Sequence, residues 1–150
     1  MINLKQELYN ECLNYVQQRM DAAQLAINDA QKASTDDTKS SAGDKYETGR
    51  EMAKQETDRN MMQLNEANKL KVALNKINPG GVTNKAETGS VVFTNNGNFY
   101  IAVSAGVLSV NGENYFAVSP GSPIGLKLSG QVAGYEFKLN DKLYHIKQVI

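Results

Sequence analysis

The first half of the chain contains very few residues that interrupt helices. Residues 2–78 contain no proline, and their only glycines are Gly43 and Gly49. Apolar residues recur here at steps of three and four, the spacing of one helix face. The stripes expected from this spacing are Leu4, Leu8, Cys12, Tyr15, Ala22, Ala26 and Ala30 in the first segment, and Leu64, Ala67, Leu70, Leu74 and Ile77 in the second. Both stripes are narrow, which favours a seam between two helices over packing on a broad core.

Two helices with such stripes predict an antiparallel coiled-coil hairpin over residues 1–78, with the join at residues 34–44. At a rise of ~1.5 Å per residue, helices of about 30 residues reach ~45 Å, which exceeds the radius of a small domain. We therefore expect the hairpin to project from the rest of the chain.

The composition changes after Ile77. Pro79, Gly80 and Gly81 predict a helix stop and a linker over residues 79–87. From Ser90 the apolar residues alternate or run continuously, as in strands. Asn-Gly and Asn-Asp pairs between these runs are typical of hairpin turns, because Asn and Gly tolerate positive φ. Residues 88–150 are thus expected to form a small, mostly antiparallel sheet with one short helix, which gives an α+β fold class.

Charge and composition exclude several classes of function. Sixteen basic and 16 acidic residues give a formal net charge of zero, so we expect no independent nucleic-acid binding. A single cysteine, Cys12, and a single histidine, His145, do not supply a disulfide framework or a multi-histidine metal site. Cys12 is expected in the helical seam and His145 in a strand. No apolar stretch is long enough for a membrane span, and we expect a cytoplasmic protein without a membrane partner.

The segment from Ser122 to Phe137, SPIGLKLSGQVAGYEF, resembles the C-terminal signature of the bacterial Gre-type transcript-cleavage factors. The matching positions are Ser122, Pro123, Ile124, Gly125, Leu128, Gly130 and Gly134. Ser suits a helix N-cap, Pro the first helical turn and Gly the helix end. Tyr46, Arg50 and Glu51 match the family's Tyr-x-x-x-Arg-Glu, which follows its hairpin tip.

The resemblance implies a function in transcription elongation. Gre-type factors place an FKBP-like C-terminal domain on RNA polymerase and insert their helical hairpin through its secondary channel. Acidic tip residues help to hold a magnesium ion shared with the polymerase, which then cleaves the transcript near its 3′ end by two-metal chemistry. By this resemblance, RNA polymerase is the partner, Ser122, Pro123, Ile124 and Gly125 form the docking segment, and the chain has no catalytic residue and no tightly bound cofactor of its own.

The tip departs from the family pattern. When Tyr46 is the anchor, the two acidic positions of the family fall on Lys39 and Ala42, which cannot bind magnesium. The candidate Mg²⁺ ligands are therefore Asp36, Asp37 and Asp44; Glu47, Tyr46 and Arg50 are the other candidate tip residues. The alternative is that Asp36 and Asp37 solvate a turn, while Asp44 caps the second helix in a capping box with Glu47.

Three functions remain open from the sequence. The first is an RNA-polymerase factor of the secondary channel, which either stimulates cleavage or, given Lys39 and Ala42, only modulates the active centre. The second is a non-transcriptional coiled-coil interaction module with an FKBP-like docking domain. The third is a prolyl isomerase, for which the sequence contains no motif.

Overall fold

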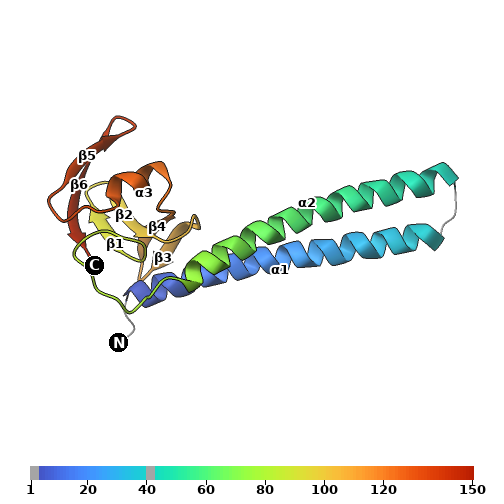
Figure 1. Ribbon diagram of the computed structural model, residues 1–150, viewed down its shortest axis with the longest axis horizontal. Helices are drawn as coiled ribbons and strands as arrows, with labels where there is room; N and C mark the ends of the chain where they lie inside the picture. The colour runs from blue at the N-terminus through green and yellow to red at the C-terminus, as the bar shows by residue number, and fades with distance from the viewer. Residues whose placement is uncertain (1–3, 40–42) are drawn as a thin grey trace. The chain divides into compact units, whose positions relative to one another are not determined.

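The computed structural model describes residues 4–39 and 43–150, with side chains given outside residues 33–48. Two long helices, α1 (Leu4–Lys39) and α2 (Gly43–Asn75), precede a sheet domain with one short helix (Figure 1). The elements of the sheet domain are β1 (Val91–Thr94), β2 (Gly97–Ile101), β3 (Gly106–Val110), β4 (Glu113–Val118), α3 (Pro123–Leu128), β5 (Glu136–Leu139) and β6 (Lys142–Val149). The predicted α+β architecture is confirmed.

The chain divides into two compact units. One consists of Met1–Tyr15 together with Lys71–Ile150, and the other consists of Val16–Leu70. The first unit therefore combines the sheet domain with the start of α1 and the end of α2. The second unit is the hairpin proper.

The hairpin packs through a seam with a seven-residue repeat. Val16, Ala23 and Ala30 are buried at steps of seven on α1, with Ile27 buried between the last two. On α2, Ala67 is fully buried, and Ala53 and Asn60 are half-buried at the two preceding heptad positions. Such a repeat is the pattern of a two-helix coiled coil.

The stripe predicted on α2 is confirmed, but the stripe predicted on α1 is one residue out of register over its middle. Ala22 is exposed and Tyr15 only half-buried, whereas the neighbouring Ala23 and Val16 are buried. From Cys12 the buried face continues by four residues rather than three. Steps of three and four are both compatible with one helix face, so the spacing alone did not select between them.

The predicted join at residues 34–44 was too wide. Helix α1 continues to Lys39, and α2 begins at Gly43. Residues 34–39 contain neither glycine nor proline. A helix that has already formed extends at little cost through such a stretch, because the unfavourable step is nucleation.

The sheet has six strands in the order β3-β4-β2-β1-β6-β5. All neighbouring strands are antiparallel except β2 and β4, which pair in parallel with Phe99 opposite Phe116. The turns Asn111-Gly112 and Asn140-Asp141 have positive φ at both positions, as two-residue hairpin turns of type I′ require. The expected mostly antiparallel sheet and its Asn-rich turns are confirmed.

One apolar core of the sheet domain lies between the sheet and α3. Its buried members are Ala86, Val92, Phe99, Ile101, Leu128, Phe137, Ile146 and Val149. Aromatic rings run across this face from strand to strand, and the rings of Phe137 and Tyr144 stack with centroids 5.0 Å apart. The short helix α3 is thus held by Leu128, which is fully buried.

The start of α1 belongs to the same unit. Leu8 and Cys12 of α1 and Tyr100 of β2 are fully buried. Burial raises the pKa of Tyr100, and the nearby Cys12 raises it further. The expected burial of Cys12 is confirmed, although it lies in the unit of the sheet domain rather than in the hairpin unit.

The segment after α2 is fastened at both of its ends. The Lys5 ammonium donates a 2.6 Å hydrogen bond to the carbonyl of Gly81, and desolvation lowers the pKa of this lysine. Ala86 is buried, its N–H donates to the carbonyl of Gln131 at 2.8 Å, and its carbonyl accepts from Gly130 at 2.7 Å.

No helix in the described part of the chain combines the length and the apolar character that crossing a membrane demands.

Candidate functional site

The segment that carries the family resemblance forms α3 and its two flanking turns. Ser122 is the N-cap: its hydroxyl accepts the N–H of Gly125 at 3.1 Å and donates to the carbonyl of Ser119 at 2.7 Å. Pro123 is the first helical residue, where its missing N–H costs no hydrogen bond. The predicted roles of these two residues as helix start are confirmed.

No residue with a Cβ can replace Gly125 without a shift of the backbone. A Cβ built there would lie 2.1 Å from the carbonyl oxygen of Ser119 and 2.9 Å from the hydroxyl of Ser122. The cap and the glycine therefore depend on each other, because the turn of residues 119–122 folds back onto the first turn of α3. The glycine of the motif has a packing role that the sequence did not reveal.

The two later glycines of the motif are needed for their backbone conformation. Gly130 follows α3 with φ +84°, and Gly134 has φ +98°. The N–H of Gly134 donates to the carbonyl of Ile146 at 2.8 Å, which ties the segment after α3 to β6. Both glycines supply positive φ, which side chains with a Cβ rarely adopt.

The structure separates the predicted docking residues into two groups. Gly125 is buried, Ser122 is half-buried within the cap, and Ile124 is half-buried against the core. Only Pro123 of the four is exposed. Beside it lies Leu126, whose side chain is 68% exposed. Leu126 follows Pro123 by three residues, so the two lie on the same helix face, and this spacing was the sequence signal for a second exposed apolar residue beside Pro123.

The candidate tip residues lie at the ends of the two long helices. Asp36 and Asp37 belong to α1, and Asp44, Tyr46 and Glu47 belong to α2. Their side chains fall outside the described residues, as does all of Ala42. The assignment of Asp36, Asp37 and Asp44 as Mg²⁺ ligands therefore stays a prediction from the sequence.

The interpretation of Asp44 as an N-cap is wrong for this structure. An N-cap precedes the first helical residue, whereas α2 begins at Gly43 and so includes Asp44 in its first turn. A carboxylate in the first turn still interacts favourably with the positive end of the helix. The pattern Asp-x-x-Glu does not distinguish an N-cap from a position one or two residues into the helix.

Two further candidates have assigned positions. Arg50 is exposed on α2. His145 lies in β6, where its Nδ1 is 3.0 Å from a carboxylate oxygen of Glu136 on β5 and its backbone N–H donates to Asn95 at 2.6 Å. The expected role of His145 as a sheet residue with partners is confirmed. Across the described residues, no group of three or more His, Cys, Asp or Glu side chains is arranged to hold a metal ion.

Comparison with known proteins finds similarity among solved structures. No protein-family model and no curated protein match this chain. A solved structure, "Structure of the transcription factor Gfh1", is similar to it at 17% sequence identity and a TM-score of 0.33, over 89% of this chain and 88% of the other. At this level the similarity decides neither the family nor the function of the chain.

Proposed function

We propose that this protein is a transcription factor of the Gre type, which binds RNA polymerase and acts through its secondary channel. The observation that carries the proposal is the combination of two features in one chain. A helical hairpin made of helices of 36 and 33 residues is followed by a sheet domain that contains the complete Ser122–Gly134 signature. In this signature Ser122, Pro123, Gly125 and Gly130 each have a defined structural role in α3.

The docking surface of the proposal is the exposed side of α3. Ser122 and Gly125 shape the turn, and Pro123 and Leu126 are the apolar side chains left outside. An exposed leucine beside a proline gives a rigid apolar contact, because the short helix is fixed by its cap and by Leu128. Lys127, in the last turn, adds a positive charge to this surface.

The action at the active centre is proposed to be modulation. Lys39 and Ala42 occupy the acidic positions of the family, so the remaining tip oxygens are those of Asp36, Asp37 and Asp44. Magnesium retains several waters and binds to one or two carboxylates beside other oxygen ligands. The tip would therefore share an ion with the polymerase rather than hold one alone, and the chain itself would catalyse no reaction.

Polymerase binding is tested with the full chain and purified RNA polymerase from the same source, by biolayer interferometry. Leu126→Lys should weaken binding by about tenfold, because it removes an apolar contact and places a second charge on α3. Val82→Lys is the matched control, because Val82 is 88% exposed and lies outside α3. If the wild-type chain does not bind, or if both variants bind as the wild type does, the proposed docking is wrong.

The tip is tested in transcription assays on backtracked and paused complexes. Asp36→Asn with Asp37→Asn should change pausing or inhibition without affecting polymerase binding by more than a few-fold. Asp29→Asn with Asp58→Asn makes the same charge change at exposed positions away from the helix ends. If the wild-type chain stimulates transcript cleavage and the tip variant does not, the protein is a cleavage factor instead of a modulator. If the tip variant and its control behave alike in both assays, Asp36 and Asp37 have no role at the polymerase active centre.

A further inference from the structure

The strand β3 is an open edge of the sheet. It pairs on one side with β4, and no strand among the described residues pairs with its other side. Its sequence, GVLSV, contains no charge and no proline, and its pairing with β4 shows no register shift. Charges, prolines and β-bulges are the features by which edge strands usually block the addition of another strand, and β3 has none of them. The opposite edge, β5, does carry charges, at Glu136 and Lys138.

The turn after β3 determines which backbone groups face outward. Asn111 and Gly112 form a two-residue turn with φ +54° and +81°, so the flanking pair Val110–Glu113 exchanges both of its hydrogen bonds. Hydrogen-bonded pairs alternate along an antiparallel ladder. The N–H and C=O groups of Val107 and Ser109 therefore point away from β4, and within the described part of the chain no other backbone group bonds to them.

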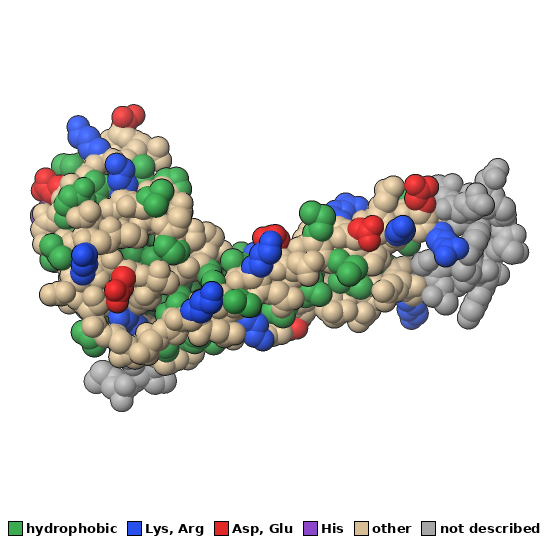
Figure 2. Space-filling model, viewed as in Figure 1, with side chains coloured by type: hydrophobic (Ala, Val, Ile, Leu, Met, Phe, Trp, Pro, Cys, Tyr) green, Lys and Arg blue, Asp and Glu red, His purple; other side chains and the backbone are tan. Residues whose placement is uncertain are grey.

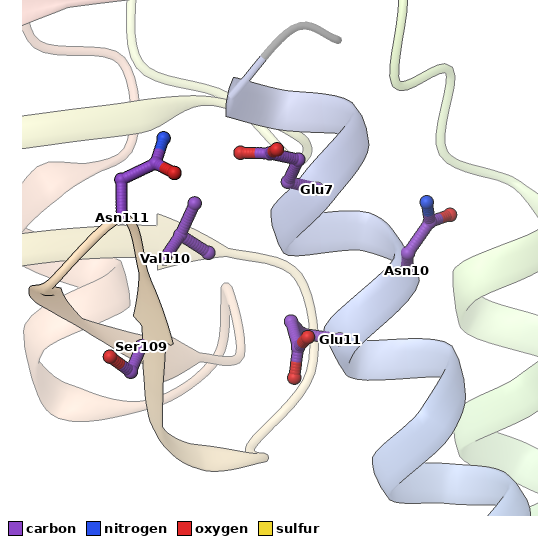
Figure 3. A pocket seen from close by; sticks show the side chains of 6 residues that line it. All are labelled: Glu7, Asn10, Glu11, Ser109, Val110 and Asn111. Carbon is purple, nitrogen blue, oxygen red and sulfur yellow. The ribbon is translucent and has the colours of Figure 1, made fainter.

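A polar cavity lies beside this edge. It has a volume of about 250 Å³ and is lined by Glu7, Asn10 and Glu11 of α1 and by Ser109, Val110 and Asn111 at the end of β3 (Figure 3). All six residues belong to one compact unit. The side chains of Glu7 and Glu11 extend from α1 toward β3 in Figure 3.

The cavity carries uncompensated negative charge. Glu7 and Glu11 are one helical turn apart, and neither forms an ion pair within 4.0 Å with any residue that the structure describes. Glu7 also acts on Tyr115: burial is the largest cause of the raised pKa of this tyrosine, and the charges of Glu113 and Glu7 raise it further. Like charges four residues apart destabilise a helix, so a cation held between them would relieve an existing repulsion.

We propose that the β3 edge binds an extended segment of a partner protein as an added strand, with an arginine or lysine of that segment held between Glu7 and Glu11. The edge supplies main-chain hydrogen bonds, which are independent of sequence, and the cavity selects one side chain. Alternate residues of an added strand point to the same face of the sheet, so one residue in two is directed toward α1. A guanidinium donates paired, charge-assisted hydrogen bonds to carboxylates.

This proposal goes beyond the function proposed above and does not depend on it. The surface lies on β3 and the first turns of α1, whereas the docking surface proposed for polymerase lies on α3. Experiments with an isolated peptide involve no polymerase, so the failure of one proposal is distinguishable from the failure of the other.

The test uses the ¹⁵N-labelled full chain and the acetylated, amidated peptide Ser-Thr-Val-Arg-Val-Thr-Ser, whose β-branched residues favour an extended backbone. We expect slowed amide exchange at Val107 and Ser109 and shifted signals at Glu7 and Glu11. A second peptide with glutamine in place of arginine should bind about fivefold more weakly. Equal affinity for both peptides, or no binding of the first at millimolar concentration, overturns the proposal.

Two variants separate the edge from the cavity. Glu7→Gln with Glu11→Gln should abolish the preference for arginine, whereas Glu51→Gln with Glu56→Gln, an equal charge change at exposed positions of α2, should preserve it. Ser109→Pro removes an outward N–H at an edge position where proline is tolerated, and it should weaken both peptides alike. Loss of preference in the Glu51/Glu56 variant, or self-association of the chain through β3 that neither peptide competes with, contradicts the proposal.

Discussion

The hairpin and the sheet domain are built from different kinds of buried side chain. Among the described residues, the buried side chains of the hairpin seam are mostly small: Ala23, Ala30 and Ala67 accompany the larger Val16 and Ile27. The sheet domain buries Tyr100, Ile101, Leu128 and Ile146 completely. The free energy gained by burial rises with the apolar area removed from water. The sheet domain is therefore stabilised by contacts distant in sequence, and the hairpin gains less from each residue of its seam.

Local hydrogen bonds supplement the thin seam of the hairpin. Gln17 donates to Asp21 at 2.9 Å, and Gln24 donates to Asn28 at 3.1 Å, each across one helical turn. Pairs of this kind contribute about 0.2–0.5 kcal/mol each to an isolated helix. Charges of both signs are interspersed along the two helices in Figure 2, as expected of solvated helix faces. The comparison shows a region of local, additive stability joined to a region with a cooperative core.

The largest expected difference comes from the same substitution in both regions. Ile101→Ala should lower the free energy of unfolding by about 4 kcal/mol, and Ile27→Ala by about 2 kcal/mol, because small neighbours in the seam leave fewer contacts to lose. Urea unfolding monitored by circular dichroism and tyrosine fluorescence measures both. Equal losses at the two sites would contradict the contrast between the regions.

Gly125→Ala tests a constraint that only the sheet domain contains. The added Cβ would collide with the carbonyl of Ser119, which is a backbone group and cannot move aside as the end of a flexible side chain can. We expect the free energy of unfolding to fall by about 3 kcal/mol, so that the tyrosine fluorescence changes at a lower urea concentration. Gly121→Ala is the control, because a Cβ at Gly121 meets nothing within 4 Å. A stable Gly125→Ala variant with α3 intact would remove the physical reason given for this motif position.

The sequence was sufficient for features that depend on local chemistry. Proline and glycine placement located the change from helices to strands, and Asn-Gly at 111–112 identified a turn with positive φ. The sequence also indicated that Ser122 caps α3. Each of these depends on the residue itself and its immediate neighbours.

Features that depend on distant contacts were missed or displaced. The α1 stripe was out of register because Tyr15 and Val16 are both apolar, and only the partner helix selects between them. The apolar run at 99–110 did not reveal that β4, rather than β3, lies beside β2. The cavity at Glu7 and Glu11 joins residues about 100 positions apart, and no local pattern connects them.

A smaller effect is expected from the polar position in the hairpin seam. Asn60 is half-buried, at the heptad position between Ala53 and Ala67. A polar residue at such a position costs stability and fixes register. Asn60→Leu should raise the free energy of unfolding by about 1 kcal/mol, and Asn65→Leu, an exposed control on the same helix, should leave it within about 0.5 kcal/mol. A destabilised Asn60→Leu variant would show that the asparagine makes a net favourable contact.

The smallest expected effect near neutral pH comes from the buried thiol of the sheet unit, because its contribution to stability changes only at high pH. Burial raises the pKa of Cys12 from 9.0 to about 12, with a further contribution from Glu11. A folded-state pKa above the unfolded value means that the folded protein retains the proton longer, so stability is fully present below about pH 9 and is lost as the pH rises toward 12. Cys12→Ala should reduce the slope of unfolding free energy against pH in this window. Tyr100, whose pKa burial also raises, still titrates in that variant, so some slope should remain.

In the wild-type chain, alkylation of Cys12 at pH 8 should be slow until urea unfolds the protein, because the reactive thiolate is scarce and the side chain is fully buried. Rapid alkylation of the folded chain, or an unchanged slope in Cys12→Ala, would show that the start of α1 opens readily, and the sheet unit would then lack the cooperative core that distinguishes it from the hairpin.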